Sequence, residues 1–155
     1  MSCILKIIDI SKKFSEVKVL NNVNFSLNKG EIHGIVGANG SGKSTLMNIL
    51  FGSKYIAETG GYKGKIFIEN KLVNIKNTYD AINNGIGMVH QELSLIDALD
   101  VSSNIKMKRE NIISKTKFFR DFAIVDEKQN YKDTAKALSK IGIEIDPATK
   151  VKDLS

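Results

Sequence analysis

Residues 37–45 read Gly37-Ala-Asn-Gly-Ser-Gly-Lys43-Ser44-Thr45, a glycine-rich stretch with the spacing Gly-x4-Gly-Lys-Ser. Glycine lets the backbone curl so that its N–H groups point inward, and it leaves no side chain in the way of a phosphate oxygen. A helix that starts near Lys43 adds unpaired N–H donors and the positive end of its dipole. The stretch therefore predicts a loop, called here the glycine loop, that binds the phosphates of a nucleotide, namely ATP with magnesium.

The side chains at the end of the glycine loop suit this ligand. Lys43 is long enough to reach the β- and γ-phosphates, Ser44 offers a hydroxyl to magnesium, and the Thr45 hydroxyl can donate to a phosphate oxygen. A flexible glycine turn before a helix is the alternative, but it does not require strand, loop, helix and Lys-Ser-Thr in this order. The predicted nucleotide-binding residues of the loop are Gly37, Asn39, Gly40, Ser41, Gly42, Lys43, Ser44 and Thr45.

The flanking segments predict an α/β fold. Isoleucine-rich or alternating apolar residues predict strands, and apolar positions at helical spacing after Lys43 predict a helix that stops at Gly52. Asp126, with Gln129 three residues later, predicts the N-cap of a helix that runs to about Lys140. The predicted strands are 3–10, 23–27, 31–36, 65–69, 72–75 and 86–89, and the predicted helices are 43–51, 78–83 and 127–140.

Length and composition are those of one soluble domain. The chain has 155 residues, of which 42% are hydrophobic and 26% charged. The single cysteine, Cys3, allows no intramolecular disulfide and favours the cytoplasm, and a lipid anchor at Cys3 lacks a preceding apolar segment. No stretch approaches the length of a membrane span. The net charge of +6 comes from scattered lysines, which favours a solvated surface over a nucleic-acid site.

Three stretches resemble the ATP-binding subunit of ABC transporters, and the resemblance covers essentially the whole chain. They are residues 24–46, which include the glycine loop, Gly87-Met-Val-His-Gln-Glu-Leu93, and Val151-Lys-Asp-Leu-Ser155. The resemblance implies an α/β fold: a partial P-loop nucleotide-hydrolase core with an N-terminal antiparallel β subdomain and part of a C-terminal helical subdomain. It divides the chain into 1–91 and 92–155, with the start of the family's signature motif at the end.

The resemblance also assigns roles outside the glycine loop. Gln91 matches the family's glutamine, which contacts magnesium and the attacking water, and its loop faces the membrane-spanning permease subunits. Phe14 matches the aromatic residue that stacks on adenine, with Val19 near it. The alternatives are a polar residue that ends a strand for Gln91 and a core phenylalanine for Phe14. The remaining partners implied are ATP, magnesium and a second ATPase domain across the nucleotide.

Further residues are similar to the sugar-import branch of this family, whose members import ribose, galactose or related monosaccharides. They are Val89-His-Gln-Glu-Leu-Ser-Leu-Ile96, Asn104-Ile105 and Ile143-Glu-Ile-Asp-Pro147. Ala38 stands where that branch usually has glutamate. The resemblance implies a protein peripheral to the inner face of the cell membrane that couples ATP hydrolysis to sugar import. It also implies that the chain corresponds to the N-terminal portion of the first of two ATPase halves.

The family's catalytic Asp-Glu strand and switch histidine belong after the signature motif, and Leu154-Ser155 matches only the start of that motif. Phe122-Ala-Ile-Val-Asp126-Glu127 has the written form of that strand but precedes the signature, so we expect Asp126 to be a helix N-cap. His33 and His90 are not expected to act as bases. We therefore expect this chain alone to bind nucleotide but to hydrolyse it negligibly, and to expose an apolar edge.

Three other functions stay open. A small self-contained P-loop kinase or GTPase would need its own magnesium aspartate, for which only Asp126 fits the pattern. A non-transport ABC ATPase that acts on ribosomes or nucleic acid is permitted by the basic charge but disfavoured by the residues around Gln91. A binding fragment that competes with full subunits is also compatible with the sequence.

Overall fold

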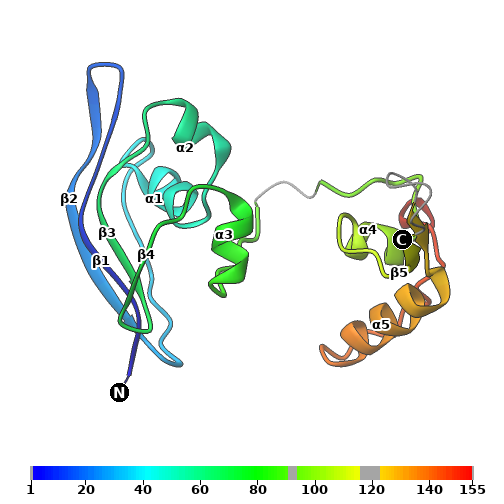
Figure 1. Ribbon diagram of the computed structural model, residues 1–155. Helices are drawn as coiled ribbons and strands as arrows, with labels where there is room; N and C mark the ends of the chain where they lie inside the picture. Colours follow the sequence, from blue (N-terminus) through cyan, green and yellow to red (C-terminus); the bar gives the residue numbers. More distant parts are fainter. Residues whose placement is uncertain (1, 91–93, 116–122, 155) are drawn as a thin grey trace. The chain divides into compact units, whose positions relative to one another are not determined.

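The computed structural model describes residues 2–90, 94–115 and 123–154 (Figure 1). The chain forms two compact units, unit 1 (Met1–Val89) and unit 2 (His90–Ser155). Gln91, the predicted contact to magnesium and water, lies outside the described residues. Unit 1 combines an antiparallel sheet with helices, so the predicted α/β class is confirmed.

The sheet of unit 1 has four antiparallel strands in the order β2-β1-β3-β4. Ser15 and Glu16 form the turn between the first two strands. The predicted hairpin near Asn70 is confirmed, with its turn at Glu69 and Asn70, where both residues have positive φ as in the favoured two-residue hairpin turns. The strands are β1 (Cys3–Phe14), β2 (Val17–Asn28), β3 (Lys63–Ile68) and β4 (Lys71–Val73).

An irregularity in β1 explains how its isoleucines reach the core. Ile7 and Ile10 are three residues apart, so they would face opposite sides of a regular strand. The pairing of β1 with β2 shifts register between these two residues, and Asp9 between them has a φ of 55°. Because the bulge reorients the strand, Ile7 and Ile10 are both fully buried.

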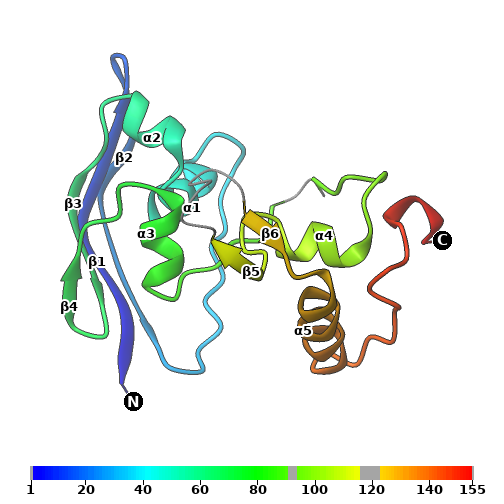
Figure 2. The same cartoon turned by 45° about the vertical axis from the view of Figure 1, so that its right-hand side comes forward.

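Three helices lie on one face of this sheet (Figures 1 and 2). The predicted helices near 43–51 and 78–83 are confirmed as α1 (Lys43–Leu50) and α3 (Thr78–Asn83), whereas α2 (Lys54–Glu58) was not predicted. α3 starts at Asn77, whose side-chain oxygen accepts a hydrogen bond from the N–H of Asp80 at 2.9 Å. The core between helices and sheet is formed by Ile7, Ile10, Leu20, Leu46, Ile49, Leu50, Ile56, Ile66, Ile75 and Ala81.

Gly52 ends α1 as predicted, and packing shows why no other residue fits there. Its φ is 67°, and a Cβ atom at this position would lie 2.3 Å from the carbonyl oxygen of Asn77. The end of α1 therefore approaches the N-cap of α3 so closely that only glycine leaves enough room.

The predicted strands over 31–36 and 86–89 are wrong for this structure, because neither segment is in a strand. Ile32 is 99% exposed, and Val36 and Val89 are each 93% exposed. A strand forms only when its N–H and C=O groups pair with a neighbour, and within the described part of the chain these β-prone segments have no partner strand. The apolar side chains of these segments are exposed, but no strand edge forms there.

Unit 2 consists of short elements around one longer helix. They are α4 (Val101–Lys106), β5 (Ile112–Lys115), β6 (Ala123–Val125), α5 (Glu127–Ser139) and the 3₁₀ turn η1 (Val151–Asp153). The predicted N-cap is confirmed, since Asp126 Oδ1 accepts a hydrogen bond from the N–H of Gln129 at 2.9 Å. α5 buries Asn130, Thr134 and Leu138, which are spaced four residues apart on one face.

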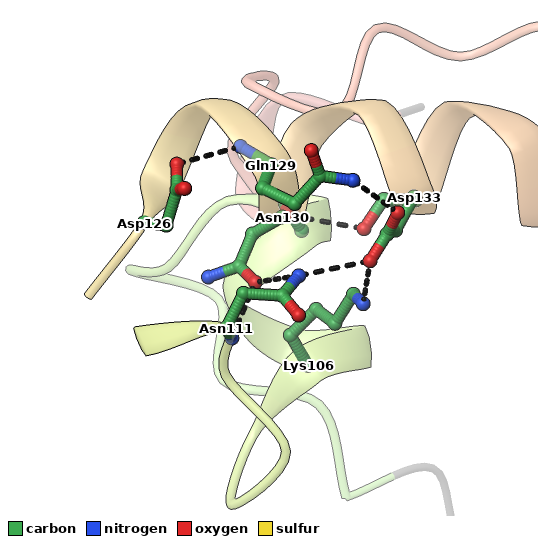
Figure 3. A network of polar contacts seen from close by, with 8 residues as sticks. Lys106, Asn111, Asp126, Gln129, Asn130 and Asp133 are labelled. Atoms are coloured by element: carbon green, nitrogen blue, oxygen red, sulfur yellow. Dashed lines mark hydrogen bonds and ion pairs between the residues drawn. The ribbon is translucent and has the colours of Figure 1, made fainter. Parts of the chain in front are cut away.

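A polar network joins α5 to the segment after α4 (Figure 3). Asp133 accepts hydrogen bonds from Lys106 Nζ at 2.7 Å, from Asn111 Nδ2 at 2.8 Å and from Gln129 Nε2 at 2.8 Å. Asn130 Oδ1 accepts from the backbone N–H of Asn111 at 2.8 Å. The Lys106 ammonium, together with the two amides, lowers the pKa of Asp133 from 3.8 to about 2.

The last part of unit 2 pairs with its beginning. The N–H of Val101 donates to the carbonyl of Thr149 at 2.9 Å, and the N–H of Val151 donates to the carbonyl of Leu99 at 3.0 Å. This pairing fixes the segment before Leu154 against the segment that leads into α4. None of the helices in the described part of the chain has the length and hydropathy that spanning a bilayer requires.

Candidate nucleotide-binding site

The glycine loop lies between segment 31–36, which has no regular secondary structure, and α1, which begins at Lys43, so the loop is not part of an unbroken helix. Gly42 has a φ of 94°, and a Cβ atom there would lie 2.7 Å from Leu20 Cδ2 and 2.9 Å from the carbonyl oxygen of Val19. Gly42 is therefore required both by its backbone conformation and by the close approach of β2.

A different contact brings Gly37 close to Ser41. A Cβ atom at this position would lie 2.7 Å from the hydroxyl oxygen of Ser41. The loop also closes on itself through a hydrogen bond of 3.2 Å from the N–H of Ser41 to the carbonyl of Ala38. The loop is thus a compact turn in which residues 37 to 41 lie close together.

The Lys43 side chain folds back over the loop. Its ammonium group donates hydrogen bonds to the carbonyl oxygens of Gly37 at 2.6 Å and Ala38 at 2.8 Å. Within the described ranges, Lys43 forms no ion pair with a carboxylate. Because its present acceptors are neutral carbonyls, the Lys43 ammonium group can move to an incoming anion without breaking an ion pair.

The first turn of α1 adds further donors. The N–H of Leu46 is bonded to the carbonyl of Gly42 at 2.9 Å, so the N–H groups of residues 43–45 precede the first helical hydrogen bond. No acidic residue lies in this turn, and no side chain caps the helix. Within the described residues, the positive end of α1 is therefore not neutralised by a carboxylate of its own first turn or by a side-chain cap.

Within the described residues, magnesium fits this site as an ion shared with phosphate. Ser44 is exposed in the first turn of α1, where its hydroxyl can reach a metal ion. The described residues contain no group of three or more His, Cys, Asp or Glu that would hold a metal by itself. Mg²⁺ commonly keeps several waters and binds through few protein groups together with substrate phosphates, which suits a single hydroxyl.

Phe14 lies at the end of β1 and is half-buried against the core. Its ring stacks on Tyr55, with ring centroids 5.1 Å apart and an interplanar angle of 24°, and Lys12 Nζ lies 4.6 Å from the Phe14 centroid. One face of Phe14 is thus occupied from within the chain, as a core residue requires, while Tyr55 is 54% exposed. Val19 lies beside Gly42, where it supports the glycine loop.

The sequence did not single out Lys12 or Tyr55. Lys12 is only 2% exposed, and its ammonium group donates to the carbonyl oxygens of Thr59 at 2.8 Å and Gly61 at 2.7 Å. In the sequence, Lys12 and Lys13 are indistinguishable neighbours. Only the pairing geometry of β1 separates them, because it turns Lys12 inward and leaves Lys13 exposed.

His33 and Asp126 both make structural contacts, and for Asp126 this is the expected helix cap. His33 stacks on Phe25 with ring centroids 5.3 Å apart, and its Nδ1 lies 3.4 Å from a carboxylate oxygen of Glu31. Asp126 uses its carboxylate to cap α5.

The chain matches a protein-family model described as ABC transporter over residues 20–155. It is 39% identical to the xylose import ATP-binding protein of Geobacillus kaustophilus over 154 residues. It is 42% identical to the ribose import ATP-binding protein of Caldanaerobacter subterraneus over 155 residues, and 41% identical to a galactose/methyl galactoside import ATP-binding protein of Fusobacterium nucleatum over 151 residues. The predicted resemblance to the sugar-import branch is confirmed.

The matched region is a part of these relatives. It covers 99% of this chain but 28% of the xylose import protein, and 100% of this chain but 29% of the ribose import protein. Among solved structures, a nucleotide-free ATP-binding cassette from an ABC transporter aligns with a TM-score of 0.74 and 27% identity, over 99% of this chain and 59% of that chain. An ADP conformation of such a cassette aligns with a TM-score of 0.72 and 25% identity, over 100% of this chain and 60% of the other.

Proposed function

This chain belongs to the ABC transporter family, and from that premise we propose that it binds ATP through residues 37–45 as part of an ATPase that drives sugar import. The observation that carries the proposal is the closed glycine loop at the start of α1, with the Lys43 ammonium group 2.6 Å from the carbonyl of Gly37. The match to the family over residues 20–155 supports the same assignment.

Binding would proceed by exchange of partners at the loop. Phosphate oxygens accept hydrogen bonds from the N–H groups at the start of α1, and the Lys43 ammonium group moves from the two carbonyls to the phosphates. Charge-assisted hydrogen bonds are stronger than those to neutral carbonyls, so the exchange is favourable. Thr45 donates its hydroxyl to a phosphate oxygen, and Ser44 would hold magnesium. When bound, magnesium neutralises part of the phosphate charge.

The finer assignments extend this proposal. Gln91 would contact magnesium and the attacking water, and Phe14 would stack on the base. The nucleotide-binding core would comprise residues 1–91 and the helical subdomain residues 92–155. The loop around Gln91 would face the permease subunits at the inner face of the cell membrane, with a second ATPase domain across the nucleotide. Similarity to xylose, ribose and galactose import proteins supports a monosaccharide as the transported substrate.

The chain alone would bind nucleotide but turn it over negligibly. The acidic pair that resembles a catalytic strand lies at the start of α5, where the Asp126 carboxylate already accepts the capping hydrogen bond. Phosphate release from ATP and magnesium, measured on the chain with Lys43→Ala as control, tests this part. Magnesium-dependent turnover that disappears in Lys43→Ala would contradict it, whereas equal background rates are expected.

A further inference from the structure

A second pocket in unit 1, separate from the glycine loop, has an unusual charge. It has a volume of about 520 Å³ and lies between the end of the β1–β2 hairpin and the segment that enters β3. Three exposed lysines line it, Lys13 on β1, Lys18 on β2 and Lys63 at the start of β3. We call it the lysine pocket. Among the residues that the structure describes, none of the glycine loop and no aspartate or glutamate lines it.

The strand register brings like charges together at this pocket. Lys13 and Lys18 are direct partners in the pairing of β1 with β2, and Ser11 next to them is the partner of Lys63. Like charges directly opposite each other across two strands destabilise a sheet. In the part of the chain that the structure describes, none of the three lysines forms an ion pair.

A buried charge lies beneath these lysines. Lys12 also lines the pocket, yet its side chain is almost fully buried. Its ammonium group donates to the carbonyl and hydroxyl oxygens of Thr59 at 2.8 and 2.9 Å and to the carbonyl of Gly61 at 2.7 Å. All of these acceptors are neutral. Buried charges are normally paired with an opposite charge, so the lysine pocket combines four positive charges with no carboxylate in its lining.

We propose that the lysine pocket binds a phosphate group that carries two or more negative charges, either a free polyphosphate ion or the head group of an anionic phospholipid. A compact anion between Lys13 and Lys18 would offset the repulsion between their ammonium groups, because each would then attract the anion. Lys63 would provide a third cationic contact. Ser15 and Asn22 in the lining add a hydroxyl and an amide as neutral donors. The lysine pocket and the glycine loop share no lining residue in the described part of the chain, so the two sites can be tested separately.

Pyrophosphate is a suitable probe, provided that the glycine loop is disabled. In a Lys43→Ala background, titration calorimetry at low salt should detect pyrophosphate binding. Adding Lys13→Ala and Lys18→Ala should weaken it at least about tenfold, because two charge-assisted hydrogen bonds are lost. The matched control, Lys29→Ala with Lys71→Ala, removes two exposed lysines outside the pocket and should change the affinity less than about twofold.

Vesicles distinguish the two sources of phosphate. Sedimentation with phosphatidylcholine vesicles, with and without phosphatidic acid, is compared between the same variants. Binding of pyrophosphate alone assigns a free anion, and retention on phosphatidic acid vesicles that requires Lys13 and Lys18 assigns a lipid head group. Equal binding by the pocket and control variants, or no binding of either probe, overturns the proposal.

Thermal melting checks that the pocket variant is folded. Without ligand, Lys13→Ala with Lys18→Ala should melt no lower than the Lys43→Ala parent, because it removes a like-charge pair. Pyrophosphate should raise the melting temperature of the parent and of the control, but not that of the pocket variant. If pyrophosphate raised the melting temperature of the pocket variant as much as that of the parent, the anion would bind elsewhere and the proposal would be wrong.

Discussion

The ammonium group of Lys43 lies 2.6 Å from the carbonyl oxygen of Gly37, so the side chain of the first helical residue spans the whole glycine loop. The contact keeps a cation at the loop before any ligand arrives, and it uses an acceptor that a phosphate oxygen can replace. A second bond, of 2.8 Å to Ala38, has the same neutral character. Lys43 therefore both closes the loop and carries the charge that the proposed function needs.

Replacing Gly42 should damage the site through sterics alone. Gly42→Ala puts a Cβ atom 2.7 Å from Leu20 Cδ2 at a φ of 94°. Left-handed strain costs about 1–2 kcal/mol, and overpacking adds about 1–3 kcal/mol. Urea unfolding of unit 1 should show this loss of free energy.

Gly30→Ala is the matched control, since Gly30 has a φ of 77° but open space around its Cβ position. Gly30→Ala should lower the free energy of unfolding only by the cost of left-handed backbone strain, about 1–2 kcal/mol. Equal losses in the two variants would mean that β2 does not restrict the loop at Gly42.

Lys12 should stabilise unit 1 in a way that its neighbour Lys13 does not. Lys12→Met leaves the carbonyl oxygens of Thr59 and Gly61 without their buried donor. An unsatisfied buried acceptor costs about 1–3 kcal/mol, which removal of a buried charge partly offsets. Thermal unfolding should show a clear drop for Lys12→Met and a change within about 0.5 kcal/mol for exposed Lys13→Met. Equal effects at both positions would contradict the observed burial of Lys12.

The contrast between Lys12 and Lys13 shows that local sequence does not determine which strand residues are buried. Helix α1 was predicted within one residue because its signals are local, namely apolar residues at helical spacing after Lys43 and the Gly52 stop. Which residues of a strand are buried depends on the strand register, and the bulge at Asp9 shifts the register of β1. Similarly, segment 31–36 has strand propensity, but a strand also needs a partner, which local sequence does not specify.

The candidate site divides along the same line. The glycine loop could be predicted because the groups proposed to bind phosphate lie within nine consecutive residues, from Gly37 to Thr45. The stacking of Phe14 on Tyr55 joins β1 to α2, a helix that the sequence pattern did not indicate. Contacts between distant segments depend on the fold as a whole, so a motif cannot supply them.

Asp133 should make unit 2 sensitive to acid. Its pKa is lowered from 3.8 to about 2, first by the hydrogen bond from Lys106. Because the folded pKa lies below the unfolded value, the stabilisation is present above about pH 4 and is lost as the pH falls toward 2. Over this window the protection of the α5 amides against hydrogen exchange, taken relative to the intrinsic exchange rate at each pH, should fall, and Asp133→Asn should reduce this pH dependence.

A second carboxylate-to-amide change separates this network from general acid effects. Glu144→Gln alters an exposed side chain outside the network of Figure 3 and should leave the pH dependence of α5 exchange as in the parent. If Asp133→Asn and Glu144→Gln gave the same profile, the Lys106–Asp133 contact would have no measurable role in the stability of unit 2.

Asp126 should behave as a helix cap. Asp126→Ala removes the acceptor for the N–H of Gln129 and should lower the stability of α5 by about 1 kcal/mol. Asp126→Asn keeps a capping oxygen and should lose much less. Circular dichroism during urea unfolding measures both, and equal losses would show that the cap oxygen is not what stabilises α5.

The affinity for ATP of the chain with Lys43→Ala tests the central claim most directly. Titration with ATP and magnesium should give a dissociation constant roughly 10- to 150-fold weaker than that of the unmodified chain, as expected for the loss of a charge-assisted hydrogen bond of about 1.5–3 kcal/mol. Lys29→Ala, which removes an exposed lysine from the turn before residue 31, should bind ATP like the unmodified chain. Equal ATP affinity in Lys43→Ala and Lys29→Ala would contradict the assignment of residues 37–45 as the phosphate site.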